Sequence, residues 1–237
     1  GKHMKRATME LGGHAPAIIF DDADIEKAIE VTAAAKFRNA GQVCVAPTRF
    51  LVQDGIADHF LDGFVKAAEA LKVGNGIEDG TGMGPLANER RIPAMEDMIQ
   101  DAISKGAELK TGGKRIGNKG YFFEPTVLAE VPTSAKMMND EPFGPIAIVN
   151  RFSDLDEAIG EANRLPFGLA SYAFTGSVRT AHALSRRMEA GMLTINHNGL
   201  SIPEVPFGGI KDSGYGTEGG SEAVEAYLET RFVTQMN

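Results

Sequence analysis

The sequence predicts an α/β fold: a mostly parallel, twisted sheet with helices on both faces. Short apolar runs such as residues 16–20 and 144–152 are typical of strands that are buried on both faces. Between such runs lie segments with apolar residues at helical spacing, for example Ile25, Ala28 and Ile29. Because the two kinds of segment alternate along the chain, we expect βαβ units whose strands run parallel.

The individual elements follow from local patterns. Asp21, Asp22 and Asp24 are candidates to cap a first helix that runs to about Phe37, and Gly41 is expected to end it. Further strands are expected at residues 48–53, 122–131, 144–152, 169–175 and 191–196, and further helices at residues 60–71, 93–105, 154–164, 178–188 and 221–228. Residues 229–235 have strand character without a following helix, so we expect them to pair with another chain.

Composition and charge narrow the function classes. Hydrophobic residues make up 43% of the chain and charged residues 24%, which is ordinary for a globular protein. The net charge of −8 argues against a nucleic-acid surface. The apolar runs are too short to span a membrane, no signal peptide is visible, and a single cysteine forms no internal disulfide. We therefore expect a cytoplasmic protein that binds neither nucleic acid nor a membrane.

Two glycine-rich segments, residues 73–85 and 206–216, are candidates for phosphate binding. Neither has the G-x-G-x-x-G frame between a strand and a helix, or the Gly-Lys-Ser/Thr of a P-loop. The first segment is better interpreted as a surface turn. The second is better interpreted as a loop whose backbone passes close to another group. The five histidines are scattered, with no pair at helical spacing, so no metal site is predicted.

Cys44 and two glutamates are the candidates for chemistry. Cys44 follows a helix and Gly41, where backbone N–H groups can stabilise a thiolate or an oxyanion, but a lone cysteine is more often a buried hydrophobe. Glu10 stands before a glycine pair, and Glu141 stands among prolines and Phe143. Each glutamate is either a solvated loop acid or a carboxylate with a fixed orientation. The local patterns leave these alternatives open.

Four segments together resemble the signature motifs of the aldehyde dehydrogenase superfamily. They are ELGG at 10–13, FRNAGQVC at 37–44, EPFGP at 141–145 and PFGGIKDSGYG at 206–216, in that order. The resemblance extends from about Ala7 to the C-terminus and is greatest for the succinate-semialdehyde and 2-oxoglutarate-semialdehyde branch. It implies oxidation of an aldehyde, such as the acidic succinate semialdehyde, to a carboxylic acid with NAD or NADP.

The resemblance also implies roles for individual residues. Cys44 matches the nucleophile, which forms a thiohemiacetal and then a thioester, and Glu10 matches the base that activates the hydrolytic water. Glu141 matches the acid that binds the nicotinamide-side ribose. Phe143 would pack beside that acid, and the carbonyl of Leu11 would lie near the nicotinamide amide.

Three further residues match substrate-binding positions of the family. Arg38 matches a carboxylate-binding arginine of the semialdehyde branch, and Ser201 is a second candidate for the same carboxylate. Phe207 matches an aromatic residue of the substrate tunnel. Ala46 stands where some members of the branch carry a second cysteine, which excludes a redox switch between vicinal thiols.

Family members are about twice this length, and the resemblance covers their second half. We expect residues 1–217 to form the catalytic domain and residues 218–237 a C-terminal helix and oligomerisation strand, with the N-terminal dinucleotide-binding domain absent. Such a fragment, excised or proteolysed, is expected to bind no NAD(P) and to be inactive as a dehydrogenase. Strand addition through residues 229–235 would make it a homodimer or homotetramer.

Two other hypotheses remain open. One is an enzyme that uses Cys44 for acyl transfer or hydrolysis without nicotinamide, although Glu10 is placed to activate water rather than to admit a thiol. The other is a non-catalytic assembly module that retains the fold and the C-terminal arm. A reactive Cys44 with a low pKa favours the enzymes, and an inert thiol favours the module.

Overall fold

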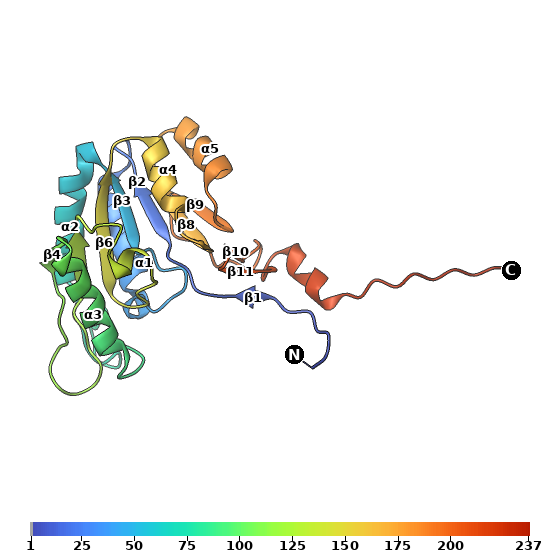
Figure 1. The fold of residues 1–237 in the computed structure, drawn as a ribbon, viewed down its shortest axis with the longest axis horizontal. Helices are drawn as coiled ribbons and strands as arrows, with labels where there is room; N and C mark the ends of the chain where they lie inside the picture. Colours follow the sequence, from blue (N-terminus) through green and yellow to red (C-terminus); the bar gives the residue numbers. More distant parts are fainter. Residues whose placement is uncertain (1) are drawn as a thin grey trace.

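The computed structural model describes residues 2–237, which build one seven-stranded sheet with helices on both faces (Figure 1). The strand order is β4-β5-β6-β3-β2-β8-β9, and every neighbouring pair is parallel except β4 and β5. The predicted α/β class is therefore confirmed. The strands are β2 (Pro16–Ile19), β3 (Arg49–Gln53), β4 (Glu108–Thr111), β5 (Thr126–Ala129), β6 (Ile146–Phe152), β8 (Ala170–Phe174) and β9 (Met192–Ile195).

Alternate residues of the central strands bury themselves in two separate cores. Ile19 and Phe50 pack with residues of α1, α2 and α3, whereas Ile18 and Leu51 pack with residues of α4 and α5. Because successive side chains of a strand point to opposite faces, a strand covered on both faces is apolar throughout, as the sequence predicts. The helices are α1 (Ile25–Phe37), α2 (Ala57–Glu69), α3 (Arg91–Ser104), α4 (Leu155–Asn163) and α5 (Val178–Arg187).

Side-chain caps fix where three of the helices begin. Asp24 is the residue that caps α1, because its side chain accepts a hydrogen bond from the backbone N–H of Lys27. Asp154 caps α4 and Ser177 caps α5 in the same way. Helix α1 ends at Phe37, as predicted, and a 3₁₀ turn, η1 (Arg38–Gly41), follows it.

Two short antiparallel pairs join the segment at residues 206–216 to distant parts of the chain, one near its start and one at residues 167–168. Strand β1 (Met9–Glu10) pairs with β11 (Gly214–Tyr215), and β7 (Phe167–Gly168) pairs with β10 (Ile210–Lys211). The sequence predicts only a loop at residues 206–216. The short strands arise from partners that are distant in sequence, which no local pattern records.

The C-terminal region is extended and lies apart from the sheet (Figure 1). The 3₁₀ helix η4 (Ser221–Tyr227) is followed by residues without regular structure, and Phe232, Val233 and Met236 are exposed. Two other 3₁₀ turns, η2 (Asp54–Ile56) and η3 (Lys136–Met138), precede α2 and β6. No helix within residues 2–237 has both the length and the apolar character needed to cross a membrane.

Candidate active site

Three segments that enter neighbouring strands meet at one edge of the sheet. Residues 10–13 lead into β2, Cys44 lies before β3, and Glu141 lies before β6. Since β6, β3 and β2 are adjacent and parallel, their amino ends lie at the same edge. Sheet topology thus brings together three residues that the sequence singles out, although they are far apart in the chain.

The glycine pair after Glu10 allows the three segments to touch. A Cβ atom on Gly12 would lie 2.7 Å from Oε2 of Glu141, and one on Gly13 would lie 2.8 Å from the carbonyl oxygen of Cys44. A side chain at Gly12 would displace the carboxylate of Glu141, and one at Gly13 would displace the backbone of Cys44. The segment of Glu10 therefore lies between those of Cys44 and Glu141.

A left-handed turn presents Cys44. Asn39, Ala40 and Gly41 all have positive φ angles, of 52°, 54° and 69°. A Cβ atom on Gly41 would overlap the carbonyl oxygen of Gly144, so only glycine fits there. The side chain of Gln42 ties the turn to its surroundings. It accepts a hydrogen bond from the backbone N–H of Ala87 at 2.7 Å and donates to the carbonyl of Asn39 at 3.0 Å.

The Cys44 thiol is half-buried among carboxylates. Burial raises its pKa most, the charge of Glu141 raises it further, and Glu10 adds a smaller effect. The backbone N–H groups of Cys44 and Val45 lower the pKa, in the direction that the turn leads one to expect, but burial and the two acids outweigh them. In this conformation the sulfur is therefore held as a thiol rather than a thiolate at neutral pH.

Glu10 faces a second acid, Glu218. Burial raises the pKa of Glu10, and Glu218 raises it further by charge and by a shared hydrogen bond. Within residues 2–237, Oε1 of Glu10 is buried and has no hydrogen-bond partner. Glu218 is held by two backbone hydrogen bonds to Phe207, of 2.6 and 2.7 Å. This pair of carboxyl groups can share a proton, which suits a group that accepts one from water.

Glu141 lies between two cations. Burial raises its pKa to about 7, while the N–H of Gly13 and the charges of Lys36 and Arg91 act in the opposite direction. Lys36 on α1 is 1% exposed, its Nζ donates to Oγ1 of Thr48 at 3.4 Å, and burial lowers its pKa to about 7. Arg91 on α3 donates to the carbonyl of Pro142, next to Glu141.

The residues assigned to cofactor and substrate binding fall into separate places. Phe143 and Leu11 are partly exposed, at 39% and 46%, beside Glu141 and Glu10. Arg38 and Ser201 line one pocket of about 370 Å³, together with the neighbours of Cys44 on both sides, Val43 and Val45, and with Tyr172 and Asn198. Phe207 is not among the residues that line this pocket; it packs partly against the main core and pairs with Glu218.

A model of the aldehyde dehydrogenase family matches residues 1–233. The chain belongs to the aldehyde dehydrogenase family. The chain is 49% identical to the putative 4-(hydroxymethyl)benzenesulfonate dehydrogenase TsaD2 of Comamonas testosteroni, and 43% identical to the NADP(+) succinate-semialdehyde dehydrogenase GabD of Escherichia coli K12. Each match covers 98% of this chain and 48% of the relative.

Solved structures give the same result. The crystal structure of succinate-semialdehyde dehydrogenase from Burkholderia pseudomallei matches with a TM-score of 0.92 at 43% identity, over 94% of this chain and 46% of that one. The chain therefore spans about half the length of the aldehyde dehydrogenases that it matches. Family membership and likeness to the succinate-semialdehyde branch are confirmed, and members of this family use NAD(P).

Local sequence patterns did not reveal several residues of this candidate site. Glu218, Lys36 and Arg91 act on the proposed catalytic acids, and the hydroxyl of Tyr172 donates to the carbonyl of Val45 at 2.6 Å. A lysine or arginine on an amphipathic helix is ordinarily solvated, so its pattern carries no signal of burial. The apolar residues that flank Lys36 on α1 are the only local indication of its position.

Proposed function

We propose that these residues form the catalytic part of an NAD(P)-dependent aldehyde dehydrogenase that acts on an aldehyde with a distant acidic group. The observation that carries the proposal is the meeting of Cys44, Glu10 and Glu141 at the amino edge of the sheet, with both acids acting on the sulfur. In this proposal residues 1–217 are the catalytic domain and residues 218–237 are the C-terminal arm.

The proposed chemistry begins at the sulfur. Cys44 releases its proton to solvent water and its sulfur attacks the aldehyde carbon, which gives a tetrahedral thiohemiacetal; loss of hydride from this carbon, to the acceptor that NAD(P) would supply when bound, leaves a thioester. Glu10 then takes a proton from water as the water oxygen attacks the thioester, and the carboxylic acid leaves as the thiol reforms. The carboxyl of Glu218 supports Glu10 because a nearby acid raises its pKa toward neutrality.

The cofactor-binding proposal concerns only the nicotinamide end. The half-buried Glu141 offers acceptor oxygens for a ribose diol, the partly exposed Phe143 offers apolar surface beside it, and the carbonyl of Leu11 would lie near the nicotinamide amide. These residues suit that end of NAD(P), which supplies the hydride acceptor when bound. One carboxylate, one aromatic ring and one backbone carbonyl make few contacts, so we expect the 237-residue chain alone to produce no steady NADH or NADPH.

Acylation of Cys44 tests the proposal without a cofactor. p-Nitrophenyl acetate should transfer one acetyl group to Cys44, as measured by intact mass, and none in Cys44→Ser. In Glu10→Gln the acetyl group should persist, because the hydrolytic water loses its base. An unreactive thiol would favour the assembly module, and rapid release of the acetyl group to added thiols but not to water would favour an acyl-transfer enzyme.

The pocket beside Cys44 supports the proposal for the substrate. Arg38 and Ser201 line it and offer a guanidinium and a hydroxyl to an anion. The two relatives named above differ in the anion that their names specify, a sulfonate and a carboxylate. We therefore propose a semialdehyde that bears one of these groups.

Reversible addition to the thiol gives a direct test of the substrate proposal. Succinate semialdehyde should protect Cys44 from iodoacetamide at lower concentrations than butanal does. Arg38→Ala should abolish this preference, because the substrate carboxylate loses a charge-assisted hydrogen bond. We expect the lost difference in binding free energy between the two aldehydes to be about 1–3 kcal/mol. Arg186→Ala on the exposed face of α5 is the matched control. Equal loss of protection for both aldehydes in Arg38→Ala would contradict the assignment.

A further inference from the structure

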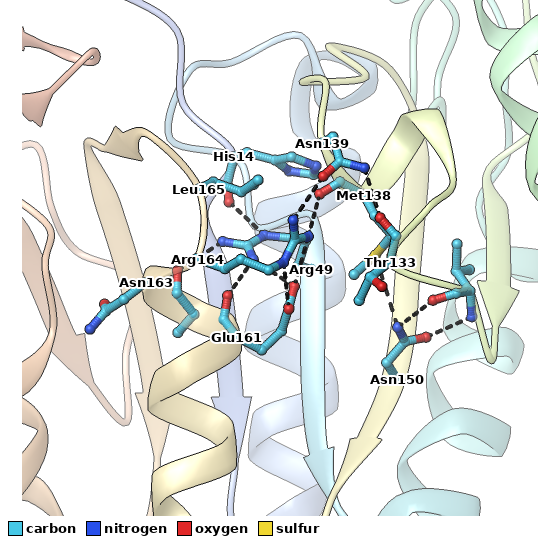
Figure 2. Close-up of polar contacts among 12 residues, drawn as sticks. His14, Arg49, Thr133, Met138, Asn139, Asn150, Glu161, Asn163, Arg164 and Leu165 are labelled. Carbon is cyan, nitrogen blue, oxygen red and sulfur yellow. Dashed lines mark hydrogen bonds and ion pairs between the residues drawn. The ribbon is translucent and has the colours of Figure 1, made fainter.

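Arg49, Glu161 and Arg164 form a cluster of charged side chains (Figure 2), in which Arg49 is buried, Glu161 is partly buried and Arg164 lies at the surface. The guanidinium of Arg49, at the start of β3, is 2% exposed and donates to Oε1 of Glu161 at 3.0 Å. Arg164 donates through Nε to the other oxygen, Oε2, at 2.7 Å. Arg49 also donates to the carbonyls of Glu161 and Ala162, at 2.8 and 3.0 Å, at the end of α4. One carboxylate thus joins two arginines.

The same arginines bind the two segments that carry Glu10 and Glu141. Arg49 Nε donates to the carbonyl of His14 at 3.1 Å, and Arg164 donates to the carbonyl of Met138 at 2.9 Å (Figure 2). Arg164 also donates to the side chain of Asn139 at 2.8 Å.

The buried ring of His14 joins the same two segments directly. Its Nε2 lies 2.8 Å from the carbonyl of Met137, and burial lowers its pKa to about 3, so the ring is neutral and Nε2–H donates. The two acid-bearing segments are therefore joined directly by His14 and indirectly by the cluster.

We propose that Arg49, Glu161 and Arg164 are positioning residues that hold the segment of Glu141 against Gly12 and so fix the place of its carboxylate relative to Cys44. The segment between η3 and β6 has no regular secondary structure of its own, and the non-glycine residue Phe143 has a φ angle of 43°. Such a segment keeps one conformation only if its surroundings impose it.

The ion pairs of this cluster are not expected to add much to the stability of the fold. A buried ion pair costs desolvation free energy, and apolar side chains of similar size often replace one with no loss of stability. Hydrogen bonds from a planar guanidinium are directional, however, and fix the relative placement of the groups they join. The cluster supplies that placement for three segments, those that begin β2, β3 and β6.

The pKa of Cys44 reports the position of Glu141. The titratable groups that face the thiol are Glu141, Glu10 and Tyr172, and those that face Glu141 are Lys36 and Arg91. Arg164 acts directly on neither Cys44 nor Glu141, so a change in the pKa of Cys44 on its substitution would come through geometry.

The rate of iodoacetamide alkylation against pH, in the whole 237-residue chain, tests the inference. Glu141→Gln should lower the pKa of Cys44, because a negative charge beside the thiolate is removed. Arg164→Lys and Arg164→Met should also lower the pKa of Cys44, by a smaller amount. When either is combined with Glu141→Gln, the pKa should fall no further than in Glu141→Gln alone. Arg151→Lys is the matched control: Arg151 is similarly exposed and pairs with Asp58 and Glu130, but it contacts no segment of the site.

The inference rests on the proposed active site, and the outcomes separate the two. If Glu141→Gln leaves the pKa of Cys44 unchanged, both the proposed site and this inference fail. If Glu141→Gln lowers it but the Arg164 variants do not, or if their effects add to that of Glu141→Gln, the inference alone fails. Thermal unfolding measured in parallel identifies a purely structural role, which would lower the melting temperature without moving the pKa.

Discussion

Lys36 and Glu141 are oppositely charged groups in one buried region, and burial moves their pKa values toward each other, to about 7 in both cases. Between about pH 7 and pH 10.5 the unfolded chain binds more protons at Lys36 than the folded chain does, so this lysine makes stability rise with pH. Between about pH 4.5 and pH 7 the folded chain binds more protons at Glu141, so this glutamate makes stability fall with pH. Together the two groups destabilise the fold most near neutral pH.

Lys36→Met should therefore stabilise the protein in a pH-dependent way. At about pH 6 the folded wild type buries an ammonium ion, and at about pH 10 it buries a neutral amine, so the gain in unfolding free energy should be larger at the lower pH. Since one pKa unit corresponds to about 1.4 kcal/mol, we expect the two gains to differ by a few kcal/mol in urea titrations. Lys66→Met on the exposed side of α2 is the control. Equal gains at both pH values would show that Lys36 is not buried as an ion.

At the scale of the element, the turn after α1 determines where Cys44 lies. Gly41→Ala should cost about 2–4 kcal/mol of unfolding free energy, because the φ angle is positive and the new Cβ would overlap the Gly144 carbonyl. The same substitution at Gly160, exposed within α4 with no atom near its Cβ position, should raise stability by about 1 kcal/mol. Chemical denaturation of both variants measures the contrast, and similar effects at the two positions would contradict it.

The sequence was most informative where structure is local. The end of α1 at Phe37, its capping by an aspartate and the apolar strands follow from spacing and composition. The extended segment expected at 122–131 shortens to β5, at Thr126–Ala129, because only these residues pair with β6. The left-handed conformations of Asn39 and Ala40 were not predicted, since glycine is the usual residue there.

The candidate site was predictable only in its parts. Cys44, Glu10 and Glu141 were identified from motifs, but their contact depends on strand order, which joins residues far apart in sequence. Glu218 was missed because it reaches Glu10 through the pairing of β1 with β11 and of Phe207 with Glu218. The Arg49–Glu161–Arg164 cluster was missed for the same reason: Arg49 lies in β3, whereas Glu161 and Arg164 lie at the end of α4, more than 100 residues later in the sequence.

At the scale of the whole molecule, the C-terminal segment gives a prediction about assembly. Members of the family are generally oligomeric, and Phe232, Val233 and Met236 present apolar side chains to solvent in an extended segment. We expect the chain to sediment as a dimer or tetramer through strand addition by this segment, and deletion of residues 230–237 to give a monomer. The deletion retains Glu229, which pairs with Arg6 at 3.5 Å. A monomeric intact chain, or an unchanged oligomer after deletion, would contradict the prediction.

The meeting of three strand entries at one edge also has a consequence for folding. Strands β2, β3 and β6 are neighbours in the sheet but are separated by long stretches of chain, so we expect their alignment to form late in folding. Until then the lone sulfur is an ordinary solvated thiol, which ionises more readily than the one in the finished site. A brief pulse of alkylating reagent during refolding would thus mark the molecules in which the sheet is still open, with no introduced label.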